Sequence, residues 1–209
     1  MKIYTRKGDA GSTGLFYGGT VSKADLAPSA YGDVDELQAV LGVARALQPD
    51  ADDAAQILRV QRELYVLMAE LATAPANHDK LVDGASRVTG DMVATLEREI
   101  DAASERFEPP REFVVPGSNP LSAALDHART VARRAERSVV ALAARDRSDA
   151  DGAWPALSYL NRLSDLLWTL ARAADDTIIR ARVVDRVDRG GAAAAPASPD
   201  TPEGTNDAT

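Results

Sequence analysis

The chain has 209 residues, which suits one domain of ordinary size, and 45% of them are hydrophobic although only 5% are aromatic. The apolar content is therefore mostly Ala, Leu and Val, which favours close packing of helices. The formal net charge of -8 argues against nonspecific binding to nucleic acid or to an anionic membrane, and the absence of cysteine excludes disulfides, thiolate metal sites and a cysteine nucleophile.

Metal binding and membrane insertion find little support in the sequence. His78 and His127 are the only histidines, too few for a zinc site built from histidine, so we expect no metal held by protein ligands. The first residues contain no apolar signal core, and no stretch approaches the roughly 18 apolar residues of a membrane span. We therefore expect a cytoplasmic protein that binds neither membranes nor nucleic acid.

Residues 1–28 are rich in Gly, Ser, Thr and Lys and show neither helical nor strand periodicity, so we expect a loop of ligand size that belongs to the single domain. Glycines allow backbone N–H groups to approach an anion, and Lys7 and Lys23 supply positive charge. A phosphate-binding loop is one interpretation, although the segment lacks the Gly-Lys-Ser/Thr ending of a P-loop. A flexible terminus without a site is the alternative.

Apolar residues then recur at spacings of three and four, which predicts helices. The five expected helices cover residues 31–47, 51–74, 90–107, 120–147 and 155 to beyond 179. Pro109 and Pro110 must end the third helix, whereas Pro120 and Pro155 suit the first positions of the last two. Five long helices with short connections indicate an antiparallel bundle over residues 29–188. Residues 189–209 contain no large apolar side chain and are expected to form a disordered acidic tail.

The fourth predicted helix carries an unusual stripe of positive charge. Arg129, Arg133 and Arg137 are four residues apart, which places three guanidinium groups on one face, with Arg134 beside them. Like charges at this spacing repel one another unless an anion faces them, and Glu136 neutralises only part of the charge. The stripe is therefore either an anion site or a solvated face paired with acids of neighbouring helices.

Two further segments allow both a structural and a functional interpretation. In YLNRLSDLLW, the amide of Asn161 suits recognition of an adenine edge or a ribose, but equally a cross-link between helices. In YGDVDEL, three acids, among them Asp35, fall in the first turn of the first predicted helix, where the helix macrodipole alone would explain them. The functional alternative is that a buried aspartate holds one of the arginines in position.

Taken in order, the segments TRKGDAGSTGL, AYGDVDEL, ARTVARRAER and YLNRLSDLLW resemble the PduO-type ATP:cob(I)alamin adenosyltransferase family, and the resemblance spans roughly residues 2–172. It implies an all-α, ferritin-like five-helix bundle that assembles as a homotrimer with its sites between subunits. It also implies transfer of the 5′-deoxyadenosyl group from ATP to the cobalt of cob(I)alamin, with Mg²⁺ bound and triphosphate released. A cobalamin reductase and a B12-dependent mutase are implied as further partners.

The resemblance implies roles for particular residues. Those implied to bind ATP are Thr5, Arg6, Lys7, Gly8, Thr13, Gly14, Lys23, Arg133, Arg134, Glu136, Arg137 and Asn161. Asp35 corresponds to the acid that forms a salt bridge with the arginine matching Arg133, and Phe113 matches the aromatic residue that lies against the corrin ring. Arg133, Asp35 and Phe113 are the three residues implied to be catalytic.

The chain departs from the family pattern at three positions. Ser118 lies where the family usually has glycine, Asp126 where a histidine is common, and Gln38 where asparagine is common. All three concern the corrinoid side of the implied site and bear on cobalamin handling more than on ATP binding. Two other functions stay open: a noncatalytic helical module that binds or delivers a nucleotide, a cofactor or an acidic partner, and phosphoryl transfer, which would leave ADP.

Overall fold

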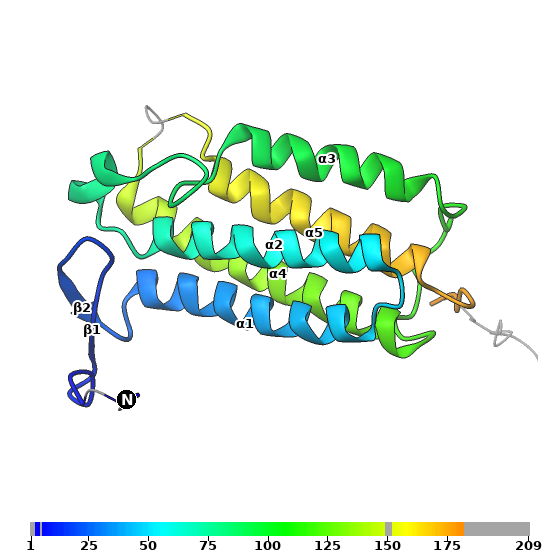
Figure 1. Cartoon of the computed structure of the whole chain (residues 1–209), viewed down its shortest axis with the longest axis horizontal. Helices are drawn as coiled ribbons and strands as arrows, with labels where there is room; N and C mark the ends of the chain where they lie inside the picture. Colours follow the sequence, from blue (N-terminus) through cyan, green and yellow to red (C-terminus); the bar gives the residue numbers. More distant parts are fainter. Residues whose placement is uncertain (1–2, 5, 149–151, 182–209) are drawn as a thin grey trace, which may run out of the picture.

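The computed structural model describes residues 3–4, 6–148 and 152–181; Thr5 and the predicted tail, 189–209, lie outside this part of the chain. The described residues form a bundle of helices with a small hairpin at one end (Figure 1). The helices are α1 (Leu26–Leu47), α2 (Ala51–Leu71), the 3₁₀ helix η1 (Pro75–Lys80), α3 (Gly90–Ser104), α4 (Pro120–Asp146) and α5 (Pro155–Ala173). The predicted all-α class is therefore confirmed.

Helix α4 lies at the centre of the packing, between α1 and α5, while α2 packs on α1 and α3 packs on α5. Successive helices run in alternating directions (Figure 1), so α1 and α2, α1 and α4, and α4 and α5 are antiparallel. Helices α3 and α5 run the same way, because both start at the hairpin end. In the part of the chain that the structure describes, no helix combines the length and the apolar character needed to span a bilayer.

The core is built by apolar side chains that recur at helical spacing, as the sequence predicted. Leucine supplies most of the fully buried large side chains, and Tyr159 is the largest of them. The hydroxyl of Tyr159 donates a hydrogen bond of 2.7 Å to Glu63 Oε2, so its polar end is satisfied. Burial is the main cause that raises the pKa of Tyr159 well above its ordinary value.

The first helix begins earlier than predicted. It starts at Leu26 because Asp25 caps it, its carboxylate accepting a hydrogen bond of 3.1 Å from the Ala27 N–H. Asp33, Asp35 and Glu36 consequently lie beyond the first turn, where the macrodipole gives them little stabilisation. The macrodipole interpretation of these acids is therefore wrong.

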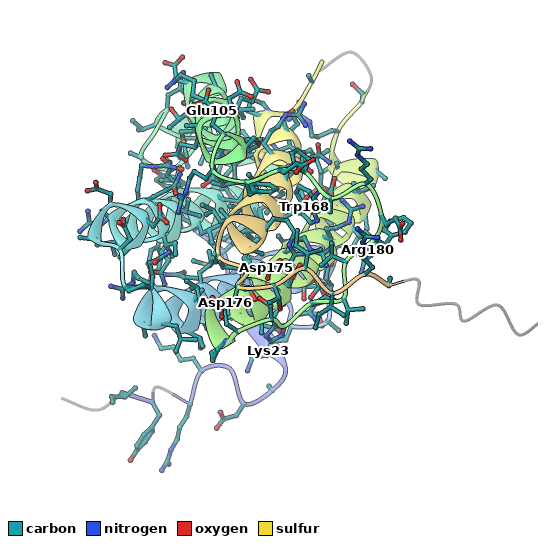
Figure 2. All side chains as sticks on the ribbon, turned by 90° about the vertical axis from the view of Figure 1, so that its right-hand side faces the viewer. Lys23, Glu105, Trp168, Asp175, Asp176 and Arg180 are labelled. Atoms are coloured by element: carbon teal, nitrogen blue, oxygen red, sulfur yellow. The ribbon has the colours of Figure 1, made fainter. Side chains whose placement is uncertain are left out.

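The last helix ends earlier than predicted, at Ala173 instead of beyond Ile179. Asn119, the N-cap of α4, donates a hydrogen bond of 2.5 Å from Nδ2 to the carbonyl of Ala174 and so satisfies a group that the helix end leaves free. Residues 174–181 then continue as an irregular segment across the end of the bundle (Figure 2).

The N-terminal segment, predicted as a loop without strands, contains a short hairpin. It contains the antiparallel strands β1 (Ser12–Gly14) and β2 (Thr20–Ser22), with Thr13 opposite Val21. Gly18 and Gly19 have φ values of 101° and 100°, a conformation that favours glycine, and they lie in the turn between the strands. This hairpin lies at the end of the bundle where α1 begins, opposite the loop that joins α3 to α4 (Figure 1).

Candidate functional site

The hairpin brings Gly8 and Lys23 together. A Cβ atom added at Gly8 would lie 3.0 Å from Lys23 Nζ and 3.3 Å from the carbonyl oxygen of Ser12. The missing side chain at Gly8 therefore gives the ammonium group room to lie against the main chain. The N–H of Lys23 donates a hydrogen bond of 2.8 Å to the carbonyl of Gly11, which fixes the lysine next to the end of β2.

The other described loop residues lie close by in the chain. Thr13 and Gly14 belong to β1, and Lys7 is exposed in the turn before the hairpin. Arg6 has a φ of 61°, and its guanidinium lies 5.6 Å from the centre of the Tyr4 ring. The segment thus gathers cations and backbone donors on one exposed hairpin, as a phosphate-binding loop requires.

A second cluster joins exposed and half-buried residues of α4 to α5. Arg133 Nη1 is 3.6 Å from Glu136 Oε2, and Asn161 Nδ2 donates a hydrogen bond of 3.1 Å to Glu136 Oε1. Arg137 donates to the carbonyl of Arg133 at 2.9 Å. The structure therefore brings together four residues that the sequence assigned to the nucleotide, and the Arg133 side chain is still 51% exposed.

Arg134 lies on a different face from this cluster. Its Nε is 3.1 Å from Asp33 Oδ1, and its Nη2 contacts Glu36, so it joins α4 to α1. The hydrogen bond with Glu36 is the main cause that raises the pKa of the Arg134 guanidinium above its ordinary value. Acids of the YGDVDEL segment therefore do hold an arginine of α4, as the functional alternative supposed. The acids are Asp33 and Glu36 instead of Asp35, and the arginine is Arg134 instead of Arg133.

The predicted pair of Asp35 and Arg133 is not formed within one chain. Asp35 is exposed on α1, and no hydrogen bond or ion pair joins its side chain to another described residue. Arg133 contacts Glu136 on the outer surface of α4. Both side chains therefore remain available to a second molecule.

The loop between α3 and α4, which carries Phe113, lies at the end of the bundle opposite the hairpin (Figure 1). Phe113 lines a cavity of about 690 Å³ there. The side chains that line the cavity include Arg111, Phe113, Asp126, Arg129, Trp168 and Arg172. The Phe113 side chain is 87% exposed, so it is not a core residue of this chain. An exposed aromatic ring next to a wide cavity is suited to contact with a large flat ligand.

The inner wall of this cavity contains ion pairs that sequence reasoning missed. Asp126 accepts from Arg129 Nε at 3.0 Å and from Arg172 Nη2 at 2.5 Å, while Arg172 Nε is 2.9 Å from Asp175 Oδ2. The side chains of Arg172 and Asp175 are each 2% exposed, and that of Asp126 is 4% exposed. The buried charges are paired, although Arg172 Nε and Asp175 Oδ2 approach each other without hydrogen-bond geometry.

The two halves of the predicted site lie far apart in a single chain. The hairpin with Lys23 is at one end of the bundle, and the loop with Phe113 is at the other (Figure 1).

Among the described residues, no three potential His, Cys, Asp or Glu ligands gather in a way that would hold a metal ion.

Comparison with known proteins finds relatives that match most of the chain. The family model described as cobalamin adenosyltransferase matches residues 3–174. The corrinoid adenosyltransferase PduO of Salmonella typhimurium is 37% identical over 184 residues, which cover 88% of this chain and 53% of that protein. The chain thus spans about half the length of this relative. A corrinoid adenosyltransferase of Citrobacter freundii is 39% identical over 180 residues, 84% of this chain and 96% of its own length.

Solved structures agree in fold. A variant PduO-type ATP:corrinoid adenosyltransferase of Lactobacillus reuteri, complexed with cobalamin and ATP, superimposes with a TM-score of 0.73 and 31% identity, over 83% of this chain and 91% of that one. Another variant from the same organism, complexed with ATP, has a TM-score of 0.74 and 30% identity, over 86% of this chain and 100% of the other.

Proposed function

The chain belongs to the cobalamin adenosyltransferase family, and from this premise we propose that it transfers the 5′-deoxyadenosyl group of ATP to the cobalt of cob(I)alamin or a related corrinoid. Within the structure, the observation that carries the proposal is the exposed Phe113 ring beside a cavity of about 690 Å³. The basic hairpin and the arginines of α4 supply the matching surface for a triphosphate.

The reaction needs no protein nucleophile. The electron pair of cobalt(I) forms the bond to the 5′ carbon of ATP, and the carbon–oxygen bond breaks with its electrons going to the triphosphate. Negative charge therefore develops on the leaving group, where preorganised cations lower the barrier. Lys7, Lys23, Arg133 and Arg137 are the residues proposed to do this.

We assign Mg²⁺ to the nucleotide and not to a resident protein site. The described residues include no group of three acidic or histidine ligands. Magnesium is commonly bound by one or two carboxylates together with phosphate oxygens and water. We therefore attribute no step of the reaction to a protein-held metal ion.

Phe113 has a separate proposed role. Its apolar ring would lie against the corrin and exclude water and a lower axial ligand from the cobalt, which makes the reduced state easier to reach. Supply of the electron by a cobalamin reductase and use of the product by a B12-dependent mutase stay predictions from the family resemblance.

We also propose that each complete site forms between two subunits of a homotrimer. The separation of Lys23 and Phe113 at opposite ends of the bundle supports this, because one chain alone does not bring them together (Figure 1). The exposed Asp35 and Arg133, unpaired with each other in the chain, are then expected to meet across the interface.

Mixing two inactive variants tests the proposal of a shared site. Lys23→Ala damages the hairpin half and Phe113→Ala the corrinoid half, so each variant alone should have little activity. When equal amounts are refolded together, about one quarter of the interfaces in randomly mixed trimers combine two intact halves. We therefore expect activity to return to about one quarter of the wild-type level.

The control is the same pair of variants mixed after each has assembled, and it should stay inactive. No recovery on refolding together, with mixed assemblies verified by mass, would show that both halves come from one subunit.

A further inference from the structure

The main chain at Phe113 is held by residues 174–181, which we call the strap. The Ala181 N–H donates a hydrogen bond of 2.8 Å to the carbonyl of Phe113, and the Val115 N–H donates one of 2.8 Å to the carbonyl of Ile179. Val114 and Arg180 form an antiparallel bridge between these bonds. Because Phe113 lies outside every helix, these contacts fix its position beside the cavity.

The first residues of the strap are tied to the start of α4. Ser118 Oγ donates a hydrogen bond of 2.8 Å to Asp175 Oδ1 and accepts one of 3.2 Å from the Asp176 N–H. Figure 2 looks onto this end of the bundle and shows the chain passing from Asp175 and Asp176 to Arg180. The Ser118 hydroxyl therefore joins the loop that carries Phe113 to the strap that holds it.

Ion pairs continue the connection into the core. Asp175 contacts Arg172 at 2.9 Å, and Arg172 contacts Asp126 at 2.5 Å. The contact between Arg172 Nε and Asp175 Oδ2 is an ion pair without hydrogen-bond geometry, but separating it would still leave a buried charge without compensation. The strap thus begins at an anchor that cannot shift without breaking a buried ion pair.

Each end of this connection depends on one polar side chain. A glycine at position 118 would have no hydroxyl to reach Asp175, and a histidine at position 126 would offer Arg172 no carboxylate. Ser118 and Asp126 thus act on the same ion pair, Arg172 with Asp175, from opposite sides.

We propose that Ser118 and Asp126 are positioning residues that, acting through Arg172 and Asp175, fix the strap and thereby hold Phe113 at the cavity. The consequence for corrinoid binding rests on the proposed function. The mechanical link from Ser118 to Phe113 does not, so it can be measured separately.

Amide hydrogen exchange in the full chain measures the link directly. In Ser118→Ala, exchange at the Val115 and Ala181 amides should become about tenfold faster, the effect expected from losing one hydrogen bond to a charged group. Amides in the middle of α2 should exchange as in the wild type. Asp126→Asn, which keeps the side-chain shape, should change the same two amides, and Ser118→Thr should restore them.

Steady-state kinetics supply the functional measurement. Ser118→Ala should raise KM for cob(I)alamin about tenfold for the same lost bond, while KM for ATP stays unchanged. Thr95→Ala is the matched control, because it removes a hydroxyl that donates within α3 to the carbonyl of Asp91 at 2.8 Å. The control should leave both KM values unchanged.

Unchanged exchange at Val115 and Ala181 in Ser118→Ala would overturn the proposal, as would equal acceleration at every amide, which would indicate global unfolding. If the wild type instead forms no adenosylcobalamin while the exchange result holds, the proposed function fails and the mechanical link remains.

Discussion

Arg133→Ala is expected to remove most of the activity and leave the fold intact. The arginine is proposed to stabilise the charge that develops on the triphosphate, and losing one such contact costs about 2 to 4 kcal/mol of transition-state stabilisation, roughly 30-fold to 1,000-fold in kcat/KM. The fold should tolerate the change because the side chain is 51% exposed and its ion pair with Glu136 is 3.6 Å long. Initial rates and a thermal melt provide the two measurements, and Arg137→Ala should behave in the same way.

Arg98→Ala is the matched control for charge alone. Arg98 is an exposed arginine of α3 whose Nη2 donates to Thr95 Oγ1 at 2.9 Å, and it lies outside the proposed site. Its removal should leave kcat/KM close to the wild-type value. Near-normal turnover in Arg133→Ala would remove the main support for the nucleotide site on α4.

Phe113→Ala is expected to abolish the corrinoid step and leave ATP binding almost unchanged, because the phosphate contacts are proposed to come from the hairpin and α4. Truncating a core phenylalanine would cost about 3 to 5 kcal/mol of stability. Phe113 is 87% exposed, so the variant should melt like the wild type. With ATP bound, wild-type protein should change the optical spectrum of cob(II)alamin as the cobalt loses its lower ligand, and the variant should not.

Tyr65→Ala controls for the loss of an exposed aromatic ring. Tyr65 is 62% exposed on α2, and its removal should leave the spectral change intact. A Phe113→Ala variant that melts low and loses ATP and corrinoid binding together would instead make Phe113 a structural residue.

The sequence predicts the helices well because their apolar stripes are long and regular, but it predicts their ends less well. Helix α1 begins at Leu26 because of one capping bond from Asp25, and α5 ends at Ala173, where Asn119 takes up the next carbonyl. Both ends depend on side-chain hydrogen bonds, and the second joins residues 55 positions apart. Periodicity carries no information about such contacts.

The residues of the candidate site were likewise predicted only in part. Arg133, Glu136 and Asn161 were predicted as one site and do form one cluster, because the packed apolar stripes of α4 and α5 bring these positions side by side. The ion pair between Asp126 and Arg172 joins residues 46 positions apart and was not foreseen. The sequence did contain a signal for this ion pair. Asp126 follows a core leucine and Arg172 interrupts an apolar run, and a charge at such a position needs a buried partner.

The separation of Lys23 from Phe113 follows from the antiparallel bundle that the sequence predicts. Because α1, α2 and α3 alternate in direction, the loop after α3 lies at the end of the bundle opposite the start of α1. A shared site between subunits is the arrangement that reconciles this separation with a single reaction centre.

Product analysis tests the central claim most directly. Wild-type protein is incubated without oxygen with chemically reduced cob(I)alamin and MgATP, and the corrinoid and phosphate products are both quantified. We predict adenosylcobalamin and inorganic triphosphate in equal amounts, because one carbon–oxygen bond breaks for each cobalt–carbon bond that forms. Formation of ADP and phosphate, or consumption of no ATP while cob(I)alamin binds, would contradict the proposed adenosyl transfer.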